Sequence, residues 1–185
     1  RVVGYHAFIF TRDNIHEEHT ELHLSYSEKN TLLAIARNSI EKRLLLQRAI
    51  PLEEWKITKN LKSKCGIFIS LTKGGKLIGS IGHLGYDVSL YQNVIDMSQA
   101  SAFDDPRFHS LIRDEVSNIN IEISVITHMR RIYELSEFKV GKHGIYIKKD
   151  EKCGIFLPQV ANEVKWNKEE FISHCARDKA GIGWD

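Results

Sequence analysis

A two-glycine turn between two apolar segments is the feature that most narrows the folds open to this chain. Residues 65–71 read Cys-Gly-Ile-Phe-Ile-Ser-Leu, and residues 76–81 form a second apolar segment after Gly74 and Gly75. Adjacent glycines supply the positive φ angles that a two-residue hairpin turn requires. The sequence therefore predicts that these two segments form an antiparallel β-hairpin.

Further segments have the composition of β-strands. Residues 121–125 alternate between apolar and polar side chains, which predicts a strand with one buried face. Residues 144–148 and 154–157 flank a short turn and predict a second hairpin, which Pro158 ends. Residues 2–10 are largely apolar on both faces, as expected for a well-buried strand.

Capping signals and apolar periodicity predict the helices. Ser25 and Glu28 have the spacing of a capping box, and apolar residues then recur at intervals of three and four, which predicts a helix over 26–46. Asn167 and Glu170 have the same spacing and predict the start of a C-terminal helix. Apolar periodicity predicts two more helices, over 89–102 and 109–116.

The order of these elements indicates the fold class. Strands and helices are interspersed without regular βαβ units, and the strands pair as hairpins, which favours the α+β class. The 185 residues are the length of one ordinary domain. We therefore expect a mixed or antiparallel sheet with hairpins, flanked by helices, in a single compact domain.

The composition excludes several classes of protein. Since no run of about 18 apolar residues occurs, we expect no membrane span and no membrane partner. Three widely spaced cysteines without a C-x-x-C pair favour free thiols in a reducing cytoplasm over a disulfide framework, so a cytoplasmic location is expected, with no metal site and no assigned cofactor. A net charge of +2 disfavours a dedicated nucleic-acid binder. Residues 37–64, with eight Lys or Arg against three Asp or Glu, leave weak nucleic-acid binding as a third reading.

Several blocks of sequence resemble one known family. They are Leu77-Ile78-Gly79-Ser80-Ile81-Gly82, Asp105-Pro106-Arg107-Phe108, Glu122-Ile123-Ser124-Val125, Gly141-Lys142-His143-Gly144, Leu157-Pro158-Gln159-Val160 and Lys179-Ala180-Gly181. In their residues and in their order, these blocks resemble those of the AMMECR-type domain, also called AmmeMemoRadiSam system protein A. The resemblance implies an AMMECR-type domain over residues 25–185. It assigns no reaction, and the sequence does not show whether the domain is an enzyme.

The sequence departs from the family signature at two positions. The signature reads Leu-Arg-Gly-Cys-Ile-Gly, but Ile78 stands in place of its Arg and Ser80 in place of its Cys. Roles of that guanidinium or thiol therefore do not transfer to this chain. Residues 1–10 resemble the closing strand of a Memo-like domain, and residues 11–24 have the polar composition of a linker.

We expect the signature blocks to converge on one cleft that binds a small ligand. Asp105, Arg107, Glu122 and His143 are the polar residues most expected to meet there, and Arg107 could offer a bidentate fork to a carboxylate or phosphate. Its structural alternative is to hold its own loop through Asp105, and His143 could equally be a hydrogen-bonded turn residue. The expected cleft comprises Gly79, Ser80, Ile81, Gly82, Asp105, Arg107, Phe108, Glu122, Ser124, His143, Leu157, Pro158 and Gln159.

Two readings of the signature itself remain open. Gly79 and Gly82 could let backbone N–H groups approach a ligand, although close packing of a strand is the favoured explanation. Ser80 and His83 have the residue types of a nucleophile and a base, but their spacing alone is too common to establish a dyad. We predict no covalent intermediate at Ser80.

The resemblance gives two functional hypotheses. In the first, the domain is a small-ligand-binding or catalytic component of an AmmeMemoRadiSam system, with a Memo-like protein, fused or separate, and a radical-SAM protein as partners. In the second, it is a non-catalytic protein-interaction module, which the missing Arg and Cys of the signature favour.

Overall fold

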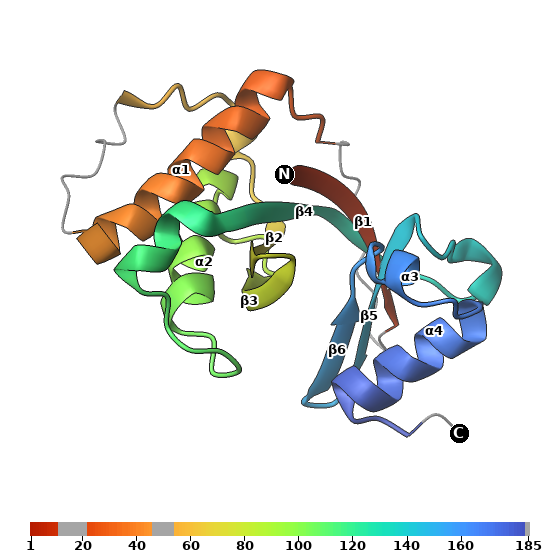
Figure 1. The fold of residues 1–185 in the computed structure, drawn as a ribbon. Coiled ribbons are helices and arrows are strands. Elements are labelled where there is room, and N and C mark those ends of the chain that lie inside the picture. Colours follow the sequence, from red (N-terminus) through yellow and green to blue (C-terminus); the bar gives the residue numbers. More distant parts are fainter. Residues whose placement is uncertain (11–21, 46–53, 184–185) are drawn as a thin grey trace. The chain divides into compact units, whose positions relative to one another are not determined.

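The computed structural model describes residues 1–10, 22–45 and 54–183 (Figure 1). Internal contacts divide the chain into two compact units. Unit one comprises Arg1–Gly4 and Leu22–Ile126, and unit two comprises Tyr5–Glu21 and Thr127–Asp185. None of the helices in the described ranges combines the length and the apolar composition of a membrane span.

Unit one is built on the predicted first hairpin. Strand β2 (Gly66–Lys73) pairs antiparallel with β3 (Lys76–His83) on one side and with β4 (Ile119–Arg131) on the other. Gly74 and Gly75 form the turn with φ angles of 56° and 79°, the left-handed region that glycine adopts without strain. The predicted hairpin is thus confirmed, and β3 is the outermost strand.

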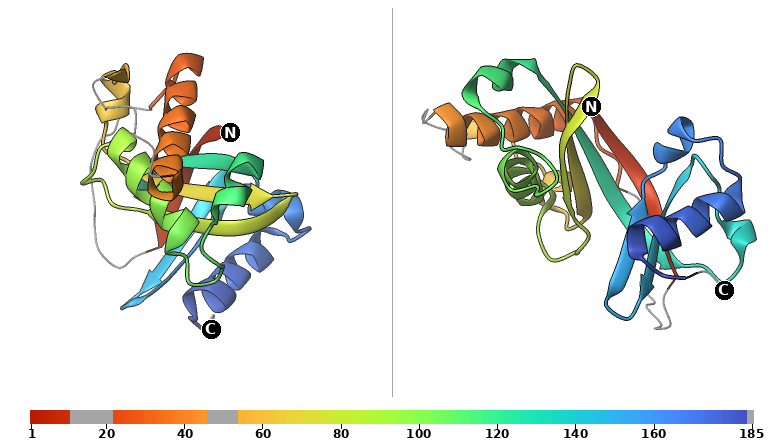
Figure 2. Two further views of the ribbon diagram at one scale, coloured as in Figure 1. Left: turned by 60° about the vertical axis from the view of Figure 1, so that its left-hand side comes forward. Right: turned by 60° about the horizontal axis from the view of Figure 1, so that its bottom comes forward.

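Two helices cover one face of this sheet (Figure 2). Helix α1 (Tyr26–Leu45) packs on α2 (Leu90–Phe103), and α2 contacts both β2 and β3. The core between helices and strands is fully buried and aliphatic, and includes Leu32, Ile40, Ile67, Ile69, Leu71, Val94 and Ile123.

The capping box predicted at the start of α1 is present. The Ser25 N–H donates to Glu28 Oε2 at 2.8 Å, and the Glu28 N–H donates to Ser25 Oγ at 3.2 Å. Glu28 also accepts from Thr58 Oγ1 at 2.5 Å and from Asn60 Nδ2 at 3.4 Å. The hydrogen bond from Thr58, with those from Ser25 and Asn60, lowers the pKa of the Glu28 carboxyl to about 2. This carboxylate therefore ties the segment around residue 58 to the start of α1.

Unit two contains the second hairpin. Strand β5 (His143–Lys149) pairs antiparallel with β6 (Lys152–Phe156) and parallel with β1 (Val2–Phe10). The short helix α3 (Val160–Glu163) and helix α4 (Lys168–His174) follow, and a π-helix, Cys175–Ala180, continues α4. The core contains an aromatic cluster beside aliphatic residues such as Ile145 and Ile172. Phe171 lies with its ring centroid 5.8 Å from that of Phe138 and 5.2 Å from that of Phe156.

The predicted fold class is confirmed, since helices flank a mixed sheet in which the β2–β3, β2–β4 and β5–β6 pairs are antiparallel and the β1–β5 pair is parallel. The strand over 2–10 and the capping box of Asn167 and Glu170 are also confirmed. The linker prediction for 11–24 falls mostly on residues 11–21, outside the described residues. The domain boundaries proposed from the sequence stay a prediction.

The helix predicted over 109–116 is wrong. A 3-10 helix, Arg113–Asn118, is found instead. The Leu111 N–H donates to the Ala102 carbonyl at 2.8 Å and the Phe108 N–H to the Asp105 carbonyl at 3.2 Å, so residues 108–111 follow the end of α2 as a loop. Apolar periodicity could not predict these contacts. Leu111 is buried because the loop packs at the end of α2, and not because it lies on the apolar face of a helix.

Candidate functional site

Position 80 of the signature lies in the middle of β3, on the face of the sheet away from α2. A Cβ added to Gly79 would lie 2.0 Å from the Ser101 carbonyl oxygen of α2, so odd-numbered positions here face the helix. Ser80 therefore faces the other side. There its Oγ lies 3.0 Å from the Oγ of Ser70, its partner across the strands.

The glycines of the signature serve close packing. Gly79 admits the backbone of α2, as just described, and Gly82 faces the ring of Phe68, which would lie 2.5 Å from an added Cβ. The explanation favoured from the sequence is thereby supported. These glycines lie inside strand β3, and not in a loop that could wrap a ligand.

The segment Asp105-Pro106-Arg107 binds the backbone of Ser80 from outside the sheet. The Ser80 N–H donates to Asp105 Oδ2 at 2.8 Å, and Arg107 Nη2 donates to the Ser80 carbonyl at 2.7 Å. Arg107 also donates to Asp105 through Nε at 3.0 Å and Nη2 at 2.8 Å. We call this pair of side chains the Asp105–Arg107 brace.

The two side chains of the brace form an ion pair with each other. Asp105 is buried, with 6% of its surface exposed, and Arg107 has 53% of its side chain exposed. The hydrogen bonds from the Arg107 side chain, and then those from the Ser80 and Arg107 N–H groups, lower the pKa of the Asp105 carboxyl to about 2. The fork expected to grip a ligand anion is thus engaged by Asp105, as in the structural alternative.

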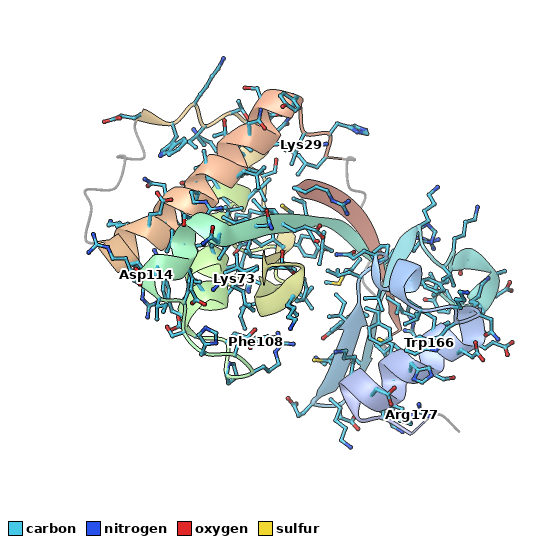
Figure 3. The ribbon with its side chains drawn as sticks, viewed as in Figure 1. Lys29, Lys73, Phe108, Asp114, Trp166 and Arg177 are labelled. Carbon is cyan, nitrogen blue, oxygen red and sulfur yellow. The ribbon has the colours of Figure 1, made fainter. Side chains whose placement is uncertain are left out.

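The loop that carries the brace is held at its other end as well. Lys73, labelled in Figure 3, lies at the end of β2. Its Nζ donates to Glu115 Oε1 at 2.9 Å. The hydrogen bond from Lys73 lowers the pKa of the Glu115 carboxyl to about 2. Phe108, also marked in Figure 3, lies with its ring centroid 5.2 Å from the Arg107 guanidinium carbon. Loop residues 104–118 are therefore anchored to both strands of the hairpin.

Ser80 and His83 do not form a catalytic dyad. They stand three residues apart on one strand, so their side chains leave opposite faces of the sheet. His83 Nε2 instead lies 2.7 Å from Asp87 Oδ1, and this hydrogen bond lowers the pKa of the Asp87 carboxyl. His83 is thus not placed to act as a base for Ser80.

A helix serine fixes the next residue of the signature. Ser101 Oγ accepts from the Ile81 N–H at 2.9 Å and donates to the Ile69 carbonyl at 2.9 Å. Ser101 is buried in α2. It therefore holds β2 and β3 from the helix face at the level where the brace holds β3 from its edge.

Glu122 and Ser124 lie on the same sheet face as Ser70 and Ser80. Glu122 is the cross-strand partner of Ser70, which places Ser80, Ser70 and Glu122 in one row across three strands. Arg1 Nε lies 3.3 Å from Glu122 Oε2. Ser124 is buried and faces Phe68 across the strands.

The remaining predicted site residues belong to unit two. His143 Nδ1 accepts from the Lys139 N–H at 3.1 Å, which fixes its turn and leaves Nε2 as the nitrogen that carries hydrogen in the neutral ring. The carbonyls of Leu157 and Pro158 accept from Val160 and Ala161, and so begin α3 just after Gln159. That these residues share one cleft with the first group stays a prediction.

Sequence reasoning did not identify Ser70 or Ser101. Ser70 could not be found from the hairpin turn alone, because a two-residue turn without a bulge would place Ile69 opposite Ser80. Ser101 left no signal, since a serine inside an apolar helix face has no distinctive pattern. Arg37, in the basic segment, donates to the carbonyls of Val116 at 2.6 Å and Ile119 at 2.7 Å, so its role is structural.

Comparison with known proteins agrees with the resemblance drawn from the signature blocks. The AMMECR1 family profile matches residues 33–185. The protein Mbar_A1807 of Methanosarcina barkeri is 33% identical over 162 residues, which cover 84% of this chain and 80% of that protein. A Methanosarcina mazei protein is 38% identical over 125 residues, covering 65% of this chain and 62% of the relative, less than two thirds of its length.

A solved structure shows the same fold. The crystal structure of the uncharacterized protein PH0010 from Pyrococcus horikoshii matches with a TM-score of 0.75 and 31% identity, over 82% of this chain and 79% of that one. The family profile covers well over half of the chain, and the solved relative shares its architecture. The chain therefore belongs to the AMMECR1 family.

Proposed function

We propose that this AMMECR1-family domain is a small-ligand-binding component of an AmmeMemoRadiSam-type system, acting beside Memo-like and radical-SAM proteins. The order of the signature blocks supports this assignment, as does the resemblance of residues 1–10 to the closing strand of a Memo-like domain. The observation that carries the binding role is the Ser70–Ser80 hydroxyl pair on the face of the sheet away from α2.

The surroundings of Ser80 favour binding over covalent catalysis. Its Oγ is paired with another hydroxyl at 3.0 Å, which is no base, and His83 faces the opposite side of the strand. Its N–H already donates to Asp105, so it cannot stabilise an oxyanion. Among the described residues named here, neither His83 nor the Ser80 N–H activates the hydroxyl, and such a hydroxyl is suited to hydrogen bonding.

Native mass spectrometry of the freshly purified chain tests the proposal. We expect a small molecule to copurify with the wild-type chain and with Ser117→Ala, an exposed serine in the same unit, but not with the Ser70→Ala/Ser80→Ala double variant. A wild-type spectrum without bound mass, repeated after incubation with a cell extract, would contradict a ligand-binding role. Equal loading of the double variant would move the site elsewhere.

The second candidate, a non-catalytic interaction module, is favoured by the residue at position 78. The register passes from Leu71–Gly79 to Thr72–Leu77, so Ile78 is the extra residue of a β-bulge, where the family signature has Arg. An apolar side chain there removes the signature's positive charge. Pull-down of a purified Memo-like protein tests this: a module should retain its partner when Ser70 and Ser80 are both alanine and no ligand is bound.

A further inference from the structure

The outer edge of β3 presents backbone groups that β2 does not bind. Ser70 and Ser80 face each other as a pair whose side chains approach closely, while the N–H and C=O of Ser80 are bound on the side of the loop. At an open sheet edge such groups are solvated, or they attract another strand. Here both are bound by side chains.

The Asp105–Arg107 brace acts in place of a neighbouring strand. One carboxylate oxygen accepts from the Ser80 N–H, and one guanidinium nitrogen donates to the Ser80 carbonyl, as the carbonyl and N–H of a paired residue would. The Arg107 N–H also donates to Asp105 Oδ1 at 3.1 Å, which fixes the turn between them. The backbone of residue 80 is thus fixed whatever side chain stands there.

We infer that Asp105 and Arg107 are positioning residues that hold the Ser80 hydroxyl beside Ser70, and that the two hydroxyls recognise a neutral ligand group which both donates and accepts hydrogen bonds. This inference rests on the proposed ligand-binding function. It names the ligand group as a hydroxyl or a primary amide, and it adds Ser70 to the site.

Counting hydrogens selects this chemistry. Each serine hydroxyl has one hydrogen and two lone pairs, and one of the two hydrogens lies in the bond between Ser70 and Ser80. One donor and several acceptor sites remain for a ligand. A carboxylate or phosphate group without a proton could use only the single donor, whereas a hydroxyl or an amide uses both kinds of site.

Charge points the same way. The positive charge of Arg107 is paired with Asp105 at 2.8 Å, so the brace is neutral as a whole. Its Nε and Nη2 already donate to Asp105 and to the Ser80 carbonyl, so the Nε–Nη2 side of the guanidinium is not open to an anion. An anionic group gains little at this point of the sheet.

Acetamide and acetate form a matched pair of probes, equal in shape but different in charge and in donors. In a nitrogen-15 NMR titration of the full chain, we expect acetamide to shift the Ser70 and Ser80 amide signals in a saturable way. Acetate should leave them nearly unchanged. Ser70→Ala should weaken acetamide binding by about tenfold, the effect of one lost hydrogen bond. Ser117→Ala, the exposed control, should bind as the wild type does.

Variants of the brace test the positioning role. Asp105→Asn keeps the size of the side chain but replaces one acceptor oxygen with an NH2 donor and removes the charge, so it cannot keep the bonds from Ser80, Arg107 Nη2, Arg107 Nε and the Arg107 N–H together. We expect acetamide binding to fall by about tenfold. Arg107→Lys keeps the positive charge and loses the planar fork. Acetamide binding should fall by less in this variant than in Asp105→Asn. This second variant keeps the test usable if Asp105→Asn does not fold.

Each outcome decides a separate claim. Stronger shifts with acetate than with acetamide would overturn the neutral-ligand class, as would the absence of any acetamide response in the wild type. Wild-type acetamide affinity in both folded brace variants would overturn the positioning role. Failure of the proposed ligand-binding function would be seen in a different experiment, as a native mass spectrum of the wild-type chain without a copurified ligand.

Discussion

The two hairpins of this chain have turns of equal length but different strand registers. In β5–β6 the pairing runs without a break from Ile145–Phe156 to Lys149–Lys152. In β2–β3 it shifts between Leu71 and Thr72, and Ile78 is left without an opposite residue. A bulge of one residue changes which side chains face each other, so it determines that Ser70, and not Ile69, lies opposite Ser80.

The two units also differ in the contacts that stabilise the interior of each one. Unit two depends on aromatic packing, with the Phe171 ring between those of Phe138 and Phe156. Unit one adds buried polar contacts to its aliphatic core, at Glu28, at Ser101 and at the Asp105–Arg107 brace. Ser101 and the brace bind backbone groups of the shifted hairpin, where partners are needed that a regular sheet would supply, whereas Glu28 joins the start of α1 to the segment around residue 58.

The largest expected effect is in unit two. Phe171→Ala should lower the free energy of unfolding by about 4 kcal/mol, because it empties the centre of the aromatic core. Urea denaturation followed by circular dichroism measures this. Tyr133→Ala removes an aromatic side chain of similar size at a position with 73% exposure, and should change stability by less than about 0.5 kcal/mol. Equal losses would refute the aromatic core as the basis of unit two.

The brace gives the next effect. Asp105→Ala should cost about 3 kcal/mol, since it removes a buried carboxylate and leaves the Ser80 N–H unpaired. Asp104, its neighbour in sequence, is a matched control that binds Arg43 at the surface with both distances at 3.2 Å. Asp104→Ala should cost below about 1 kcal/mol in the same denaturation experiment. A brace variant as stable as this control would show that β3 does not need the loop.

The close approach of α2 to β3 predicts a smaller loss. Gly79→Ala should destabilise the chain by about 2 kcal/mol, because the new Cβ meets the Ser101 backbone and the helix must move. Gly183→Ala, where an added Cβ meets nothing within 4 Å, should be near neutral. Thermal unfolding of both variants compares them, and an unchanged melting temperature for Gly79→Ala would contradict the packing described for α2.

The smallest effect depends on pH. Because the pKa of Glu28 is lowered from 4.5 to about 2 in the folded chain, its stabilisation is complete above pH 4.5 and is lost as the pH falls toward 2. Glu28→Gln should remove this part of the pH dependence, while Glu54→Gln at an exposed position should not. Unfolding curves between pH 2 and pH 6 measure it; parallel profiles for wild type and Glu28→Gln would refute the role of this carboxylate.

Local signals in the sequence predicted the elements well and their register less well. The capping residues Ser25 and Asn167 and the glycines of the first turn act within a few residues of themselves, so their roles follow from the sequence. The residue that lies opposite Ser80 on β2 depends on the bulge at Ile78. The apolar composition of the segment does not reveal that bulge. The helix expected over 109–116 failed for a related reason, because Leu111 is buried by contact with the end of α2.

The candidate site was predicted in part. The sequence pointed to Ser80, Asp105 and Arg107, and the structure joins them by hydrogen bonds. The sequence could not show that Asp105 and Arg107 bind the backbone of Ser80 and not its side chain. That distinction depends on the position of β3 at the edge of the sheet, which is a property of the whole unit.

Hydrogen exchange at the Ser80 amide tests the central claim most directly, because this N–H donates to Asp105 and not to a strand. Site-resolved exchange by NMR should show it protected in the wild type and in Asp104→Asn. In Asp105→Asn it should exchange faster by about tenfold or more, the effect of a weakened hydrogen bond to a charged acceptor. Unchanged protection of Ser80 in Asp105→Asn would contradict the account, since the brace would then not hold residue 80.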